Sequence, residues 1–230
     1  MKLAQHNKLL LFPLKVYAFK IVDFEKQRLM DFVFNLQISQ DPRQRSNRNG
    51  WQSYNNLHEN NFTEKEDIEC VSHLIEIITL GMQQVRKEWD FSCYNKNFEP
   101  KITALWVNIN PYGGRNELHD HGNTGYSGVF YINKSRQINE GEVPIDDGHI
   151  EFEDTRKEAV CWQVPSEGGR VFGGSTLNDL YSGKAIPAET GDMLIFPSWA
   201  SHRVHENLSN QVRVSASFNF NWYSNDRHRH

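Results

Sequence analysis

Ile102-Thr-Ala-Leu-Trp-Val-Asn-Ile109 begins the half of the chain whose sequence decides the fold. Its β-branched and aromatic residues are typical of a β-strand. Similar short segments follow, separated by clusters of Gly, Pro, Asn and Asp: 127–132 (SGVFYI), 149–152 (HIEF), 193–196 (MLIF) and 212–220 (VRVSASFNF). Short strands divided by turn residues predict a β-sandwich or barrel.

The first hundred residues have a different pattern. Apolar residues recur at helical spacing from Leu29 to Leu36, and again in one stripe from Ile68 to Trp89. Thr63 and Glu66 have the spacing of a capping box, which predicts the start of the second helix. Because helices gather at one end and strands at the other, the sequence predicts an α+β, mainly β fold in which N-terminal helices support a β-sandwich.

The length and composition predict one soluble domain. Residues 1–230 suit a single core, with a helical part at 1–100, a strand-rich core at 101–222 and a tail at 223–230. Hydrophobic residues make up 38% of the chain and charged residues 23%, and the net charge is −4. With no long apolar run and no basic block, neither a membrane nor a nucleic acid is an expected partner.

The cysteines favour a reducing compartment. Cys70, Cys93 and Cys161 are odd in number, widely spaced and without a Cys-x-x-Cys motif. This pattern argues against a disulfide framework and against a thiolate metal site. A cytoplasmic location is therefore expected, in the host cytoplasm if the gene belongs to a phage.

Two histidines stand one residue apart in Leu118-His-Asp-His121. If this segment is extended, His119 and His121 point to the same side, because side chains alternate along a strand. Two imidazoles that converge on one point can begin a site for iron, zinc, copper or nickel. The pair alone is equally compatible with surface histidines, so its interpretation depends on residues further along the chain. His149 and His205 have no comparable support.

A third histidine ends the segment GDMLIFPSWASH, from Gly191 to His202. Gly191-Asp192 predicts a turn, Met193 to Phe196 a buried strand, and Pro197-Ser198 a second turn. His202 then begins the next strand. Taken alone it is compatible with a structural histidine at a strand edge, but beside the earlier pair it offers a third metal ligand.

An arginine interrupts the apolar strand at 212–220. Arg213 and Ser215 share one face of this strand, and Val212 and Val214 share the other. An arginine is costly to bury unless it is paired, and a guanidinium binds a carboxylate through two parallel hydrogen bonds. Arg213 and Ser215 are therefore candidates for holding a small carboxylate. The structural alternative is a half-solvated strand face.

In chain order, these segments resemble the 2-oxoglutarate/Fe(II)-dependent dioxygenases, whose pattern is His-x-Asp/Glu, a distal His and an Arg or Lys further downstream. The closer resemblance is to a bacterial and phage branch of 2-oxoglutarate oxygenases with prolyl-hydroxylase-like features. It covers about Thr103 to Phe220, with Gly50-Trp51-Gln52-Ser53 as a weaker extension. The motifs that carry it are Asn108-Ile-Asn110, His119-Asp-His121, Ser127-Gly-Val-Phe-Tyr131, Phe196 to His202 and Arg213-Val-Ser-Ala-Ser-Phe-Asn219.

The resemblance implies a double-stranded β-helix, the jelly roll of cupins, over residues 101–222. It implies that His119, His121 and His202 are the iron ligands, with no catalytic residue beyond the metal centre. The wider superfamily carries a carboxylate where this chain has His121, so the site is one unit more positive. Asp120 is the alternative third ligand, although on a regular strand it points away from the histidines unless a bulge turns it inward.

The same resemblance implies a binding site for the cosubstrate. Arg213, assisted by Ser215, would bind the far carboxylate of 2-oxoglutarate. Tyr131 matches a position where prolyl-hydroxylase-like members place a phenol against that carboxylate. An inward aromatic residue on a barrel strand is equally compatible with a core role, so this alternative stays open for Tyr131.

The implied activity is Fe(II)- and 2-oxoglutarate-dependent oxygenation, a hydroxylation that releases succinate and carbon dioxide, with ascorbate as an accessory. Two alternatives remain: a three-His cupin-type dioxygenase without 2-oxoglutarate, and a non-catalytic jelly-roll binding module. The sequence does not identify the substrate, a small molecule or a peptidyl group, and is compatible with a homodimer. Gly141 to Gly148 and Pro165 to Ala188 are candidate lids.

Overall fold

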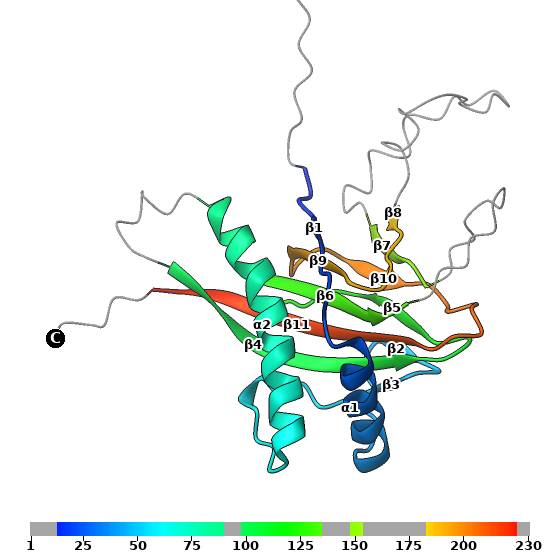
Figure 1. Ribbon diagram of the computed structural model, residues 1–230. Helices are drawn as coiled ribbons and strands as arrows, with labels where there is room; N and C mark the ends of the chain where they lie inside the picture. The colour runs from blue at the N-terminus through cyan, green and yellow to red at the C-terminus, as the bar shows by residue number, and fades with distance from the viewer. Residues whose placement is uncertain (1–12, 90–97, 135–147, 154–182, 225–230) are drawn as a thin grey trace, which may run out of the picture.

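The computed structural model describes residues 13–89, 98–134, 148–153 and 183–224 of the 230-residue chain (Figure 1). Among these residues both α-helices lie in the N-terminal part and most of the strands follow them, as the sequence predicts. The elements in chain order are β1 (Tyr17–Lys20), α1 (Lys26–Ser39), β2 (Asn47–Arg48), β3 (Trp51–Gln52), the 3₁₀ helix η1 (Leu57–Glu59), α2 (Lys65–Lys87), β4 (Phe98–Asn110), β5 (Arg115–His119), β6 (Tyr126–Asn133), β7 (Ile150–Glu153), β8 (Gly183–Ile186), β9 (Asp192–Pro197), β10 (His202–Val204) and β11 (Arg213–Ser224).

The strands form two antiparallel sheets. The larger sheet has the order β1-β9-β6-β11-β4-β3, and the smaller has the order β2-β5-β10-β7-β8. The ladder between β4 and β11 runs from Arg213 opposite Asn110 to Ser224 opposite Phe98, with one register shift at Asn219/Phe220. Two antiparallel sheets that pack face to face are the arrangement of a β-sandwich.

Side-chain alternation gives the larger sheet two distinct faces. On β11, Val214, Ala216, Phe218 and Phe220 belong to the main hydrophobic core. The alternate residues of the same strand line a cavity instead: Arg213, Ser215, Ser217 and Asn219. Because neighbouring side chains of a strand point to opposite faces, the larger sheet contributes one face to the hydrophobic core and the other face to the cavity. The polar inner face is unusual for a sandwich, in which that face is normally apolar.

Both α-helices cover the outer face of the larger sheet (Figure 1). Leu29, Phe32, Val33 and Leu36 of α1 are buried, as the helical spacing predicts. From α2 the buried apolar residues are Cys70, Val71, Leu74, Ile77, Ile78, Met82 and Val85. A smaller apolar cluster lies between the two sheets and includes Tyr131, Ile150, Phe152, Leu194 and Phe196. The helices therefore stabilise the sheet from the side opposite the cavity.

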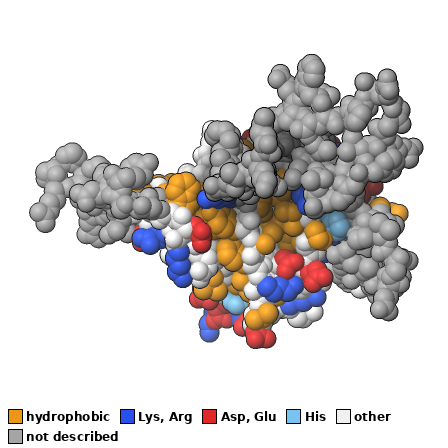
Figure 2. All heavy atoms as spheres, turned by 90° about the horizontal axis from the view of Figure 1, so that it is seen from above, with side chains coloured by type: hydrophobic (Ala, Val, Ile, Leu, Met, Phe, Trp, Pro, Cys, Tyr) orange, Lys and Arg blue, Asp and Glu red, His pale blue; other side chains and the backbone are white. Residues whose placement is uncertain are grey.

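The exposed surface is mixed in character. Figure 2 shows acidic, basic and hydrophobic side chains interspersed on the described surface visible in that view. Interspersed charges are typical of a solvated surface. Among the described residues, no helix combines the length and the apolar character that crossing a lipid bilayer requires.

One helix boundary differs from the expectation. The predicted capping box of Thr63 and Glu66 is wrong, because α2 begins at Lys65 with Glu64 as its N-cap and no side-chain cap. The Thr63 hydroxyl donates to Glu64 Oε1 (3.4 Å) and does not accept the backbone N–H that a capping box requires. Glu66 and Asp67 still occupy the first turn, where negative charge favours the helix dipole. Favourable interactions of these two carboxylates with the helix dipole therefore stabilise the start of α2 in place of a side-chain cap.

Candidate metal centre

Three histidines, two in strands of the smaller sheet and one directly after β5, converge on one point. His119 ends β5 and His202 begins β10, and the two are direct partners across the antiparallel pair. His121 follows β5, where its backbone N–H donates to Ser198 O (2.9 Å). One ligand nitrogen from each imidazole lies within 4.8 Å of the other two. The structure thus brings together the three histidines that the sequence singled out.

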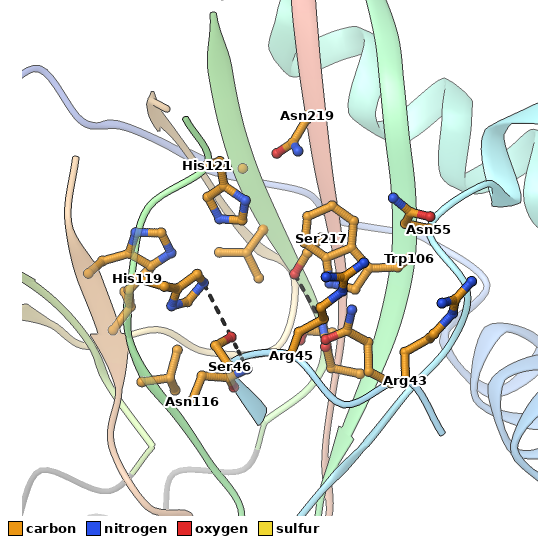
Figure 3. Close-up of a pocket in the computed structure, with 18 of the residues that line it drawn as sticks. Arg43, Arg45, Ser46, Asn55, Trp106, Asn116, His119, His121, Ser217 and Asn219 are labelled. Atoms are coloured by element: carbon orange, nitrogen blue, oxygen red, sulfur yellow. Dashed lines mark hydrogen bonds between the residues drawn. The ribbon is translucent and has the colours of Figure 1, made fainter. Parts of the chain in front are cut away.

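Backbone carbonyls orient two of the imidazoles. His119 Nδ1 lies 2.7 Å from Glu117 O, and His202 Nδ1 lies 2.8 Å from Ala200 O. A carbonyl can only accept, so each Nδ1 carries the proton and each Nε2 keeps its lone pair. Such a hydrogen bond on the distal nitrogen is the usual support of a metal-binding histidine. Ser46 Oγ lies 3.4 Å from His119 Nε2 (Figure 3).

Burial keeps the three imidazoles neutral. Desolvation lowers the pKa of His119, lowers that of His121 to about 4 and lowers that of His202 to about 3. The neighbouring histidines lower the pKa of His121 and His202 further. A metal ion needs the neutral form of each ligand, so the site is ready for a cation at neutral pH.

The position of His121 does not depend on a regular strand. β5 ends at His119, so the expected alternation along an extended segment does not apply to His121. Its ring nonetheless lies 5.1 Å from that of His119 and 5.3 Å from that of His202, centroid to centroid. Asp120 lines the same cavity, but its Oδ1 accepts the Gly122 N–H (3.1 Å) and it does not belong to the converging group.

The larger sheet contributes one guanidinium and two hydroxyl groups to the same cavity. Arg213 and Ser215 of β11 and Tyr131 of β6 line it, and each is at most 4% exposed. Ser215 and Tyr131 are direct cross-strand partners, so their side chains share one face. Arg213 Nη1 donates to Gly148 O (3.0 Å).

Tyr131 has an unsatisfied hydroxyl. Among the described residues, no hydrogen-bond partner reaches its buried phenol oxygen. Burial raises the pKa of Tyr131 to about 12, although the charge of Arg213 acts in the opposite direction. The phenol is therefore protonated at neutral pH and can donate a hydrogen bond. A buried donor without a partner is rare in a packed core and fits a ligand-binding position.

The cavity between the two groups has a volume of about 380 Å³. This volume suits a small-molecule site. The histidines enter from the smaller sheet and Arg213, Ser215 and Tyr131 from the larger one. Phe196 and Phe152 flank His202, with ring centroids at 4.8 Å and 5.7 Å, and Phe196 forms an apolar part of the cavity wall on the histidine side.

Some cavity residues escaped the sequence analysis. Arg43, Arg45 and Ser46 come from the segment between α1 and β2, and Trp106 and Asn108 come from the inner face of β4 (Figure 3). In the sequence, residues 43–46 belong to no recognised motif, and Asn108 stands out only through the Asn108-Ile-Asn110 motif, which the resemblance gives no role. The alternation of β4 would have placed Trp106 with Asn108, but no spacing signal connects Trp106 to the distant histidines.

Other sequence candidates lie elsewhere. His205 Nε2 lies 2.5 Å from Glu151 Oε2, outside the converging group, which supports a structural role. His149 is buried but does not line the cavity. Most of both candidate lids, Gly141 to Gly148 and Pro165 to Ala188, falls outside the described residues.

Solved structures share this fold at low sequence identity. A prolyl hydroxylase from Trichoplax adhaerens, in complex with a peptide of a hypoxia inducible factor, is 12% identical, with a TM-score of 0.54 over 89% of this chain and 82% of that one. HygX from Streptomyces hygroscopicus, with nickel and 2-oxoglutarate bound, is 10% identical, with a TM-score of 0.55 over 90% of this chain and 83% of that one. The expected double-stranded β-helix is confirmed.

The sequence itself also matches a family. No curated protein matches the chain. The model of a family described as "putative 2OG-Fe(II) oxygenase" matches residues 104–219. This segment runs from β4 to β11 and contains all three converging histidines together with Arg213, Ser215 and Tyr131. The chain belongs to this family of 2-oxoglutarate- and Fe(II)-dependent oxygenases.

Proposed function

We propose that His119, His121 and His202 hold the iron of this oxygenase, and that the cosubstrate binds between them and Arg213. The observation that carries this proposal is the placement of two complementary groups across one cavity. Three neutral nitrogen donors on one sheet face a buried guanidinium on the other. Imidazole donors suit ferrous iron, and a guanidinium suits a carboxylate.

Each residue then has a defined task. Arg213 neutralises the far carboxylate of 2-oxoglutarate, Ser215 adds a hydroxyl, and the unsatisfied Tyr131 hydroxyl donates to the same group. Phe196, which lines the cavity beside His202, keeps water away from the histidine side. When bound, Fe(II) and 2-oxoglutarate would activate O2, so that one oxygen atom enters succinate as carbon dioxide leaves and the other hydroxylates a substrate C–H bond.

The test is anaerobic addition of Fe(II) and 2-oxoglutarate to the full chain, followed by visible spectroscopy. We expect the charge-transfer band of the chelated cosubstrate in the wild type. Arg213→Ala should need at least tenfold more 2-oxoglutarate, because a charge-assisted pair is lost. Arg86→Ala is the control, since Arg86 pairs with Glu99 (3.0 Å) outside the cavity. No band in the wild type, or equal saturation in Arg213→Ala and the wild type, would refute the assignment.

The third ligand has its own test. His121→Ala should lower the affinity for Fe(II) or Ni(II) at least tenfold, because one nitrogen donor of the converging group is lost. Asp120→Asn should leave it nearly unchanged, because the Asp120 carboxylate accepts the Gly122 N–H. Metal titration of the two variants decides between them, and the opposite order would make Asp120 the ligand.

An assay for succinate formation distinguishes the 2-oxoglutarate-dependent reaction from the two alternative functions. A three-His dioxygenase that binds its substrate directly would release none, and a binding module would neither form succinate nor depend on His119 and His202. Arg213 and Ser215 in the cavity favour the 2-oxoglutarate-dependent reaction. Ascorbate belongs in the assay as an accessory reductant.

We further propose a single domain located in the cytoplasm. The N-terminal helices pack on the sheet that the C-terminal half builds, which supports one cooperative unit. Cys70 is a buried free thiol, which suits a reducing compartment.

A further inference from the structure

A second cationic group lies in the cavity, away from the histidines. Arg43 and Arg45, two residues apart in the segment before β2, both line it. Figure 3 shows them reaching up from this segment beside Trp106, with His119 and His121 on the other side of the view. The family assignment and the cosubstrate site make no use of either arginine.

No acidic side chain among the described residues pairs with either guanidinium. Arg28, Arg86, Arg115 and Arg203 each pair with a glutamate. Within the described part of the chain, neither Arg43 nor Arg45 forms an ion pair. Arg43 lies over the Tyr54 ring, 4.3 Å from its centroid, which leaves its hydrogen-bond donors available. The described residues that line the cavity include Arg43, Arg45 and Arg213 but one acid, Asp120, so together these residues carry a net positive charge.

The segment that carries them is held at both ends. The Arg43 N–H donates to Gln52 O (2.9 Å), and the Arg45 N–H donates to Asn47 Oδ1 (2.8 Å). Ser46 O accepts the Glu117 N–H (2.8 Å) at the start of the histidine segment. These bonds fix the backbone of the arginines relative to the metal ligands. A fixed backbone lowers the entropic cost of collecting two cations around one anion.

Trp106 and Asn108 of β4 form part of the cavity wall. The Trp106 ring lies 5.8 Å from the His121 ring, centroid to centroid. Asn108 is 5% exposed, and its Nδ2 donates to Ser217 Oγ (3.1 Å). Its Oδ1 is buried, and no donor among the described residues reaches it. A ligand along this wall therefore meets an aromatic face, an acceptor that needs an N–H or O–H, and two cations.

We propose that the primary substrate carries a carboxylate or phosphate group that Arg43 and Arg45 bind together, with its reacting carbon on the histidine side of Trp106. This inference rests on the proposed function, because it assigns Arg213 to the cosubstrate and leaves Arg43 and Arg45 for the substrate. Guanidinium groups bind both anions through paired hydrogen bonds, so the shared chemistry is an oxyanion.

The experiment measures anion binding to the Ni(II)-loaded full chain with saturating 2-oxoglutarate, which occupies the site at Arg213. Inorganic phosphate, propionate and the neutral isostere propionamide are titrated separately by calorimetry. We expect phosphate or propionate to bind and propionamide to bind at least tenfold more weakly. Tighter binding of phosphate indicates a phosphorylated substrate, and tighter binding of propionate indicates a carboxylate. Two results would overturn the inference. In the first, propionate and propionamide bind equally well and phosphate does not bind; in the second, neither anion binds.

Matched double variants locate the binding. Arg43→Gln with Arg45→Gln should weaken anion binding at least tenfold. Lys101→Gln with Lys184→Gln removes the same net charge from exposed positions outside the cavity and should leave it unchanged. Equal losses in both double variants would mean that net charge alone attracts the anion. The charge-transfer band of the wild type separates the two proposals: a normal band without anion binding refutes only the substrate inference.

Discussion

At the scale of single residues, the unsatisfied hydroxyl of Tyr131 gives a test with two independent readouts. Tyr131→Phe should raise the Kd for 2-oxoglutarate about tenfold or more, because a hydrogen bond to a carboxylate contributes about 1.5–3 kcal/mol. The ligand-free variant should be as stable as the wild type or more stable, because it no longer buries a hydroxyl that has no hydrogen-bond partner among the described residues. Calorimetry on the Ni(II)-loaded protein and urea unfolding measure the two effects.

Tyr126→Phe is the matched control for this substitution. Tyr126 lies in the same strand and is also buried, but it packs in the core on the helix side and does not line the cavity. Its variant should bind 2-oxoglutarate as the wild type does. Unchanged cosubstrate binding in Tyr131→Phe would leave Tyr131 with the core role that the sequence also allowed.

The buried histidines predict a dependence of stability on pH. In the folded, metal-free protein the pKa is about 4 for His121 and about 3 for His202, whereas in the unfolded chain histidine has a pKa of about 6.5. The unfolded chain therefore takes up protons first as the pH falls. The free energy of unfolding should be fully retained above pH ~6.5 and should decrease between pH ~6.5 and ~4. Urea unfolding across this range measures it, and His202→Gln should show a shallower decrease.

At the scale of elements, α2 supports the sheet through one face. Leu74 is fully buried, whereas Leu80 of the same helix is 60% exposed. Leu74→Ala should cost roughly 2–5 kcal/mol of unfolding free energy because it leaves a cavity in the core. Leu80→Ala should stay within about 0.5 kcal/mol. Urea unfolding compares them, and similar losses would mean that α2 does not pack as described.

The sequence predicted those elements whose pattern is local. The segments 102–109, 127–132, 193–196 and 212–220 fall within or overlap β4, β6, β9 and β11, because each is a run of strand-forming residues. Arg213 and Ser215 stood out for the same reason, as polar residues at alternate positions of an apolar strand.

Other elements depend on contacts that a local pattern does not carry. β8 (Gly183–Ile186) lay inside a segment expected to be a loop, and it exists because it pairs with β7. The loop with Arg43 and Arg45 becomes part of the site through its bonds to Gln52, Asn47 and Glu117. Long-range pairing of this kind overrides local propensity, so neither feature could be predicted from the sequence.

At the scale of the molecule, the candidate site joins two sheets. The proposed metal ligands lie in β5 and β10 of the smaller sheet or directly after β5, and Arg213 belongs to the larger sheet. A ligand that contacts both should stabilise the fold, by about 2.7 kcal/mol at a concentration 100-fold above its Kd. We therefore expect 2-oxoglutarate to raise the Tm by roughly 5–10 °C in the presence of Ni(II) and by much less in its absence.

Thermal unfolding of two variants tests whether stabilisation by 2-oxoglutarate depends on both the metal and Arg213. Arg213→Ala should keep the increase caused by Ni(II) alone and lose the further increase caused by 2-oxoglutarate. Arg86→Ala should keep both increases relative to its own baseline. An equal effect of 2-oxoglutarate with and without the metal would show that it binds elsewhere.

The pairing of His202 with His119 also limits which changes of length the chain tolerates. Residues 198–201 connect β9 to β10, and they set which side chain of β10 enters the cavity. Deleting or inserting one residue there would shift β10 by one position and turn Arg203 inward in place of His202. Evolution can therefore vary the composition of this turn far more freely than its length, and relatives that keep the activity should show substitutions there without gaps.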